Sequence, residues 1–404
     1  MVQKLPVLLA VPTLVAALNN SIVSIPDSLT YYIPADNFTT EITGEWANST
    51  TTTNSTVNSL FESAKDATFI SYSDEFLSII GEDPSITSIL CPGEDDNCAF
   101  EAGVYIPDAD EVWFTPSPYG WPDLEEGIFA FSLQNNSARK LDTTEPIYGN
   151  GAYLFDDKVW FASSQPNGGI PSSIFSVDVA SPHNVEPVLN SYFGIPFPTL
   201  DEPVWVTHGD DRYMLFTGVS FDHFLTGYPT GPMPNAVWRF DPQTGTLQPV
   251  IDRSAINTAN GIRVSPDHKT LYVTNSETLS QSGGGEGNNA STAVPGIYKF
   301  ELDDEAYPIN GRLWGLARTN IADGLHVDDQ GRVWTGEGGG IVVRNSKGKV
   351  LGEINALALA SAAVVGPIAN FALAGNKLAI GAFDRVVVIT LNETLIGSSS
   401  TIVN

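Results

Sequence analysis

The chain has very little positive charge. Lysine and arginine together number 19 among 404 residues, against 47 aspartate and glutamate residues, and the formal net charge is −28. Such a surface repels nucleic-acid phosphates and anionic lipid headgroups, which argues against nucleic acid or a membrane as a partner. The excess of acid favours cations and helps to keep a protein soluble.

Several motifs of common enzymes are missing. There is no G-x-S-x-G elbow and no alternation of strand and helix patterns, which argues against an α/β serine hydrolase. The GGGEG run at 283–287 is not followed by a helical pattern, so it is a weak phosphate-binding signal. Cysteine is limited to Cys91 and Cys98, which predict one local disulfide in an oxidising compartment; a metal site there would lack further cysteine or nearby histidine.

The N-terminal residues have the pattern of a secretory signal. Lys4 precedes an apolar run from Leu5 to Leu18 that ends in small residues, which predicts a signal peptide over residues 1–17. Residues 18–65 are rich in Thr, Asn and Ser and are expected to form a glycosylated, partly extended arm. Seven Asn-X-Ser/Thr sequons are the expected glycosylation sites: Asn19, Asn37, Asn48, Asn54, Asn135, Asn289 and Asn392. The sequence thus predicts a secreted, extracellular glycoprotein.

A repeated phrase organises residues 66–404. A turn with Asp, Gly or Asn leads into a short apolar strand at 107–115, 155–163, 209–218, 265–275, 328–336 and 373–382. Each copy is followed by a second β-rich run and, in most cases, a weaker one. This pattern predicts an all-β, six-bladed β-propeller with four-stranded blades. The last unit lacks a fourth strand, and an N-terminal strand near residues 85–90 is expected to close the ring.

A polar residue stands at the start of each predicted inner strand. These residues are Glu101, Asn150, Asp201 (with Glu202), Asn260, Asp323 and Asn370. Any one of them alone reads as an ordinary turn or strand-cap residue. Because the inner strands of a propeller line its tunnel, six such side chains are expected to converge at one end of it. Carboxylate and amide oxygens without thiol or imidazole match a hard cation, Ca²⁺ before Mg²⁺ or Mn²⁺.

Four stretches carry a family resemblance: FEAGVYIP, SYFGIPFPTLDE, ANGIRVSPDHKTLYVTN and IADGLHVDDQGRVWTG. They resemble the gluconolactonase/regucalcin-like (senescence marker protein) family and, within it, the secreted lactonohydrolases of filamentous fungi. The resemblance implies one catalytic divalent cation, commonly calcium, bound by Glu101, Asn260 and Asp323. A family asparagine in a Leu/Phe-Asn-Asp motif is replaced here by Asp201, and the histidine that tends to precede the glutamate is replaced by Phe100.

The sequence therefore predicts a calcium-dependent lactonase with a small-molecule lactone as its substrate. A bound cation would polarise the lactone carbonyl, and Asp323 or Asp201 would act as general base. The expected substrate contacts are Asp201, Asn150, His223 and Trp121. Two alternatives remain open: a non-catalytic binding propeller with a structural tunnel cation, and a divergent esterase or related enzyme. The identity of the lactone and the oligomeric state are left open as well.

Overall fold

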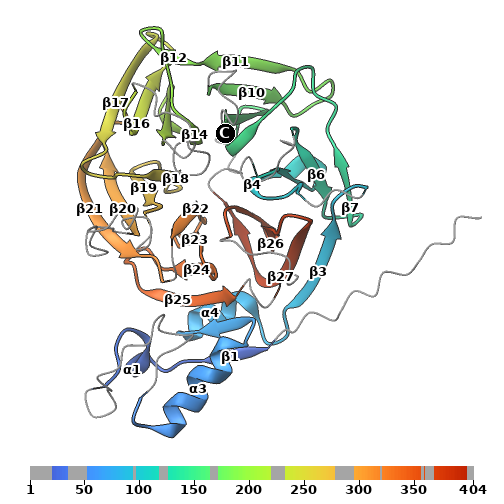
Figure 1. The fold of residues 1–404 in the computed structure, drawn as a ribbon, viewed down its shortest axis with the longest axis vertical. Coiled ribbons are helices and arrows are strands. Elements are labelled where there is room, and N and C mark those ends of the chain that lie inside the picture. Colours follow the sequence, from blue (N-terminus) through green and yellow to red (C-terminus); the bar gives the residue numbers. More distant parts are fainter. Residues whose placement is uncertain are drawn as a thin grey trace, which may run out of the picture.

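A computed structural model describes residues 21–34, 52–93, 97–117, 126–163, 172–219, 233–277, 295–318, 321–355, 359 and 368–397. Six sheets stand in a ring around a central axis, with the inner strands nearest the centre (Figure 1). This arrangement confirms the six-bladed propeller that the repeat predicts. Among the described residues, no helix has the length and apolar character needed to cross a membrane.

The first five blades each carry four consecutive antiparallel strands. Blade 1 holds β4 (Glu101–Ile106), β5 (Glu111–Thr115), β6 (Phe129–Ser132) and β7 (Ser137–Lys140), with a short 3-10 turn at Pro107–Ala109. Blade 2 holds β8 (Gly149–Phe155), β9 (Lys158–Ser163), β10 (Ile174–Asp178) and β11 (Val185–Leu189), and the small hairpin β12 (Ser191–Tyr192) and β13 (Ile195–Pro196) follows it. Blade 3 holds β14 (Leu200–His208), β15 (Asp211–Gly218), β16 (Ala236–Asp241) and β17 (Thr246–Asp252). Blade 4 holds β18 (Ala259–Val264), β19 (Thr270–Asn275), β20 (Gly296–Leu302) and β21 (Pro308–Leu316). Blade 5 begins with β22 (Ala322–Val327), β23 (Val333–Glu337), β24 (Gly340–Arg344) and β25 (Val350–Asn355).

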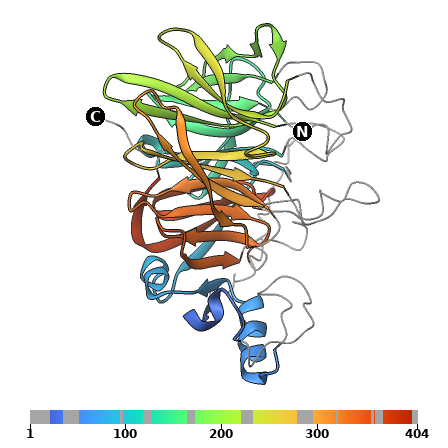
Figure 2. The same cartoon turned by 90° about the vertical axis from the view of Figure 1, so that its left-hand side faces the viewer.

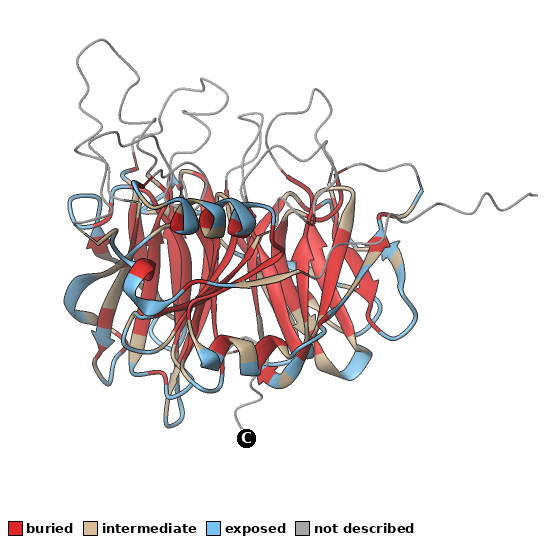
Figure 3. Cartoon of the chain, turned by 90° about the horizontal axis from the view of Figure 1, so that it is seen from below, coloured by how far each residue is buried: buried red, intermediate tan, exposed pale blue. Residues whose placement is uncertain are grey.

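Burial falls from the inner strands to the outer ones. The inner strands β4, β18 and β22 are buried almost throughout, whereas β7 and β21 on the rim are mostly exposed. Figure 3 shows the same gradient, with buried strands in the ring and exposed turns at its two ends. Because an inner strand is covered on both faces by neighbouring blades, it is buried along its length, including the polar residue at its start. A rim strand is largely exposed and gives only a weak sequence signal.

The ring closes within blade 6. Its strands are β26 (Phe371–Gly381), β27 (Arg385–Ile396) and β3 (Ser85–Leu90), and β3 pairs antiparallel with β27, as the sequence predicts. The backbone of β26 reverses near Gly375, which has φ of +65°, and the N–H of Gly381 donates to the carbonyl of Asn370 at 3.2 Å. The two arms of β26 thus serve as the first and second strands of the blade.

Two further strands extend blade 5 beyond the predicted four. β2 (Phe69–Ser71) pairs antiparallel with β25, and β1 (Ile22–Ser24) pairs parallel with β2. The helices α1 (Asp27–Thr30), α3 (Ser55–Lys65) and α4 (Asp74–Ile80) lie beside this added edge (Figures 1 and 2). In α3, Val57, Phe61 and Ala64 recur at helical spacing and are buried, and the Asn54 side chain caps its first turn. The described parts of 18–65 therefore pack against the propeller.

The two cysteines form the predicted disulfide. Cys91 and Cys98 are bonded, with their Cα atoms 5.9 Å apart. The N–H groups of Cys98 and Ala99 donate to the carbonyl of Phe383 in blade 6, at 2.9 and 3.0 Å. The bridge therefore lies at the junction between the closing strand β3 and the first inner strand β4.

Candidate active site

A β-bulge lies at the beginning of each inner strand of blades 1 to 5. The register shifts fall between Ala102 and Val104, Gly149 and Ala152, Leu200 and Pro203, Ala259 and Ile262, and Ala322 and Leu325. Each shift lies at or next to a polar residue that the sequence singles out. A bulge places an extra residue on one strand and redirects a side chain, and bulges are common next to active sites.

Glycine allows neighbouring inner strands to approach one another at these bulges. Gly151, Gly261 and Gly324 directly follow Asn150, Asn260 and Asp323 in the sequence. A Cβ atom on any of them would lie 2.6 Å from a backbone oxygen of the next blade. The recurring Asn-Gly and Asp-Gly pairs are therefore a sequence signal of this close contact, one that the polar residues alone do not give.

Replacing Gly261 by alanine is expected to lower the free energy of unfolding by about 1–3 kcal/mol, because the obstructing atoms belong to backbone that cannot rotate away. The new Cβ would lie 2.6 Å from Asp323 O and 3.0 Å from Gly324 Cα. Urea denaturation measures the effect. Gly315→Ala is the control, since its Cβ would meet nothing nearer than 3.6 Å. Equal losses in the two variants would contradict the close contact at Gly261.

Four carboxyl groups gather where the inner strands begin. Glu101, Asp201, Glu202 and Asp323 are all buried, with exposed fractions of 7%, 2%, 1% and 7%. Burial, together with the charges of Asp323 and Asp201, holds the pKa of Glu101 well above its usual range. Burial and the nearby charges of Asp323 and Glu202 do the same to the pKa of Asp201. Burial raises the pKa of Asp323 to about 7, partly offset by a hydrogen bond from Asn260.

The predicted amides lie among these carboxyls. Asn150 Nδ2 donates to Asp201 Oδ1 at 2.8 Å, and Asn370 Nδ2 lies 3.4 Å from both Glu101 Oε2 and Glu202 Oε1. The structure thus connects the polar residues of all six blades. Two buried oxygens of this set, Asn150 Oδ1 and Asp201 Oδ2, make no hydrogen bond. A buried acceptor without a donor is costly, so these atoms suit a ligand that completes their bonding.

One carboxyl of the cluster, Glu202, forms a buried ion pair that sequence reasoning missed. Glu202 Oε1 is 2.8 Å from Arg263 NH2, and the two side chains are 2% and 0% exposed. The N–H of Ile262 donates to Glu202 Oε2 at 2.9 Å, and the guanidinium donates to the carbonyls of Ala152 and Ile262 at 3.0 and 2.8 Å. Burial raises the pKa of Glu202, and Arg263 opposes that rise.

The donor set fits a hard divalent cation. Glu101, Asn260 and Asp323 offer carboxylate and amide oxygens, and like charges at Glu101 and Asp323 repel unless a cation or a proton intervenes. In the part of the chain that the structure describes, no three His, Cys, Asp or Glu side chains form a metal-binding group on their own. The predicted ligand set of Glu101, Asn260 and Asp323 is of a different kind, because one of its three members is an amide.

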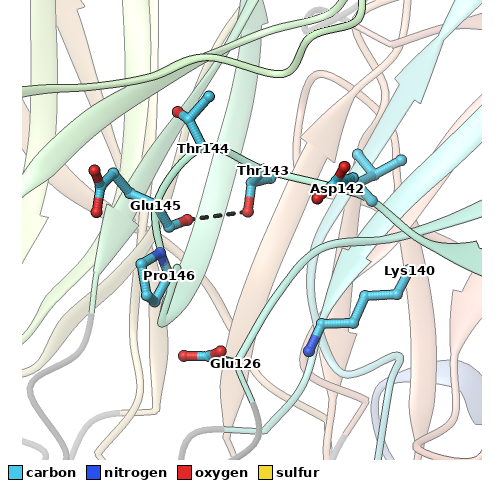
Figure 4. Close-up of a pocket in the computed structure, with 8 residues that line it drawn as sticks. Glu126, Lys140, Asp142, Thr143, Thr144, Glu145 and Pro146 are labelled. Carbon is cyan, nitrogen blue, oxygen red and sulfur yellow. Dashed lines mark hydrogen bonds between the residues drawn. The ribbon is translucent and has the colours of Figure 1, made fainter.

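Other predicted site residues do not belong to this cluster. His223 and Trp121 lie outside the described residues, as do residues 1–17 and the sequons Asn19, Asn37, Asn48 and Asn289. Asn135 and Asn392 are exposed, and Asn54 is half-buried. A pocket of ≈ 410 Å³ lies along the segment between β7 and β8 (Figure 4), lined by Glu126, Lys140 and residues 141–146. It includes none of the site residues above.

The described residues therefore define a six-bladed propeller with a buried carboxylate–amide cluster at the start of its inner strands. Within that class, residues 215–369 match the SMP-30/Gluconolactonase/LRE-like region. The match confirms the resemblance drawn from the sequence motifs.

Three relatives illustrate the similarity. A lactonohydrolase of Aspergillus oryzae is 25% identical over 359 residues, which cover 72% of this chain and 74% of that protein. The structure of a gluconolactonase from Xanthomonas campestris superposes with a TM-score of 0.59 at 18% identity, covering 80% of this chain and 93% of the other. A calcium-binding regucalcin from Agrobacterium tumefaciens gives a TM-score of 0.50 at 14% identity, covering 76% and 94%. At these identities the two structures support the fold alone.

Proposed function

We propose that this chain is a secreted hydrolase that opens the ring of a small lactone with the help of a divalent cation, calcium before others. One observation carries the proposal: the inner strands bring four buried carboxyls and three amides to one place, and three of these residues match the family's ligand pattern. The likeness to a lactonohydrolase of Aspergillus oryzae supports the choice of substrate class.

Glu101, Asn260 and Asp323 would hold the cation through their side-chain oxygens. A cation bound there supplies Lewis-acid polarisation of the lactone carbonyl and charge stabilisation for the developing oxyanion. The protein's own residues exclude water, since every member of the cluster is buried. Asn150 and Asp201 have free acceptor oxygens, which would accept hydrogen bonds from the substrate. His223 and Trp121 are proposed as further substrate contacts.

A carboxylate of the cluster would accept the proton of the attacking water. Asp323 is one candidate for this role, because it is a buried carboxyl at the proposed site and a carboxylate there can act as general base. Asp201 is the other candidate, since its Oδ2 has no hydrogen-bond donor and is free to accept. The acid at this position, in place of the family's amide, adds negative charge beside the cation.

Secretion is part of the same proposal. A disulfide persists in oxidising compartments, and the bond between Cys91 and Cys98 agrees with the signal-peptide pattern over residues 1–17. Glycosylation is proposed at the seven sequons. Attachment at Asn54 would leave its helix cap intact, because the cap uses the side-chain oxygen rather than the amide nitrogen.

Lactone turnover is expected to disappear on treatment with EDTA and to return when calcium is added. Hydrolysis of a panel containing an aldonolactone, pantolactone, an aromatic lactone and a linear ester measures this, with the bound metal determined in parallel. Turnover that is indifferent to EDTA would refute the role of the cation. No turnover of any compound, with calcium still bound, would favour the non-catalytic binding propeller.

A further inference from the structure

Two buried threonine hydroxyls connect the backbones of three successive site residues. Thr217 Oγ1 lies 2.6 Å from the carbonyl oxygen of Asn260 in the next blade. Thr274 Oγ1 lies 2.7 Å from the carbonyl oxygen of Asp323, again in the next blade. Both threonines are completely buried. Each hydroxyl therefore forms a hydrogen bond to the backbone of a proposed cation-binding residue in the next blade.

The same hydroxyls also accept hydrogen bonds within their own blades. The N–H of Glu202 donates to Thr217 Oγ1 at 3.0 Å, and the N–H of Gly261 donates to Thr274 Oγ1 at 2.8 Å. Each hydroxyl has one proton to give. Its distance to the carbonyl in its own blade is 3.4 Å in both cases, so the shorter contact to the next blade takes that proton.

These bonds form one continuous chain across blades 3, 4 and 5. It runs from Glu202 through Thr217 to Asn260, and from the adjacent Gly261 through Thr274 to Asp323. The threonines stand opposite the bulges of β14 and β18, where the inner strand has no regular partner. In blade 5 the corresponding position is Gly336, where a Cβ would lie 2.3 Å from Ile368 O. Glycine has no hydroxyl, so the series of hydrogen bonds ends at this blade.

We propose that Thr217 and Thr274 are positioning residues that set the spacing between Glu202, Asn260 and Asp323. Neither threonine is proposed to bind the cation or the substrate. Each acts through the backbone at its bulge. Because Asn260 and Asp323 are two of the three proposed cation ligands, this inference rests on the proposed function. Groups that orient metal ligands from behind commonly change metal affinity by about 10- to 100-fold when removed.

The test replaces each hydroxyl by a methyl group of similar size. Thr217→Val and Thr274→Val are expected to weaken calcium binding, measured by calorimetry on the intact chain, by about tenfold or more. Thr217→Ser and Thr274→Ser keep the hydroxyl and are expected to restore affinity to within about threefold of the wild type. Thr335→Val is the matched control, because Thr335 is equally buried but its hydroxyl bonds to Glu337 Oε1 in its own blade.

Calcium affinity unchanged in both valine variants would overturn the proposal. Equal losses in Thr335→Val, or no recovery with serine, would also overturn it, because the effect would then come from general destabilisation. A wild-type chain that binds no calcium would refute the proposed function instead. Hydrogen exchange at the Gly261 amide then decides the inference: faster exchange in Thr274→Val supports the threonine chain, and unchanged exchange refutes it.

Discussion

Asp323→Asn is expected to reduce lactone turnover by about 10²- to 10⁴-fold while making the metal-free protein more stable at pH 8. Asparagine keeps the shape and the amide can still ligate weakly, but it can neither take a proton from water nor carry charge. The loss of turnover is measured as kcat with saturating calcium. Asp304→Asn, at an exposed position between β20 and β21, is the control for an equivalent chemical change.

The gain in stability follows from the pKa of Asp323. In the metal-free folded protein this carboxyl has a pKa of about 7, against about 4 in an unfolded chain. Between these values the folded state binds more protons than the unfolded state, so stability falls as pH rises from 4 to beyond 7. The asparagine variant has no such proton to lose. Its free energy of unfolding should exceed that of the wild type at pH 8 by roughly 1–4 kcal/mol and match it more closely at pH 5.

Urea denaturation of both proteins in EDTA, at pH 5 and pH 8, measures this difference. Full activity in Asp323→Asn would refute its place in the mechanism. A variant that is inactive but no more stable at pH 8 would keep the catalytic role and contradict the raised pKa. The two outcomes are separate because one is measured with calcium and the other without it.

The repeat was sufficient to predict the blades and the gathering of polar residues where the inner strands begin. Each copy of the phrase contains its own strands and turns, so the local sequence predicts them, and the polar residues stand at the same point of each copy. The added strands of blade 5 were not predictable in this way. Phe69 pairs with Ile354, and nothing near residue 69 identifies a partner so far along the chain.

The contacts within the site were harder to predict from the sequence than the residues that form it. Arg263 sits in the strand pattern ANGIRVS as an ordinary alternating residue, and its partner Glu202 comes from the preceding blade. No residue type identifies a β-bulge in a sequence. The glycine that follows Asn150, Asn260 and Asp323 is the one local signal of these bulges. A contact between blades depends on backbone spacing that the sequence encodes only through such small residues.

Replacing Arg263 by methionine is expected to lower the free energy of unfolding by about 3–5 kcal/mol. The change leaves Glu202 buried beside Glu101, Asp201 and Asp323 with no positive charge to offset it. The guanidinium also donates to two backbone carbonyls, which lose their donor. Urea denaturation measures the loss, and Arg312→Met, on the exposed rim strand β21, should change stability by less than about 0.5 kcal/mol.

The double variant Glu202→Gln/Arg263→Met distinguishes a broken ion pair from a lost packing contact. Removing both charges avoids an isolated buried charge, so the double variant should be more stable than Arg263→Met alone. A pair that is neutral as a whole contributes no net charge to the cluster, and calcium affinity in the double variant should therefore stay near that of the wild type. If the double variant is no more stable than Arg263→Met, packing rather than charge accounts for the loss. If it recovers stability but not calcium affinity, the pair also fixes the geometry of Asn370, whose amide lies within 3.4 Å of both Glu101 and Glu202.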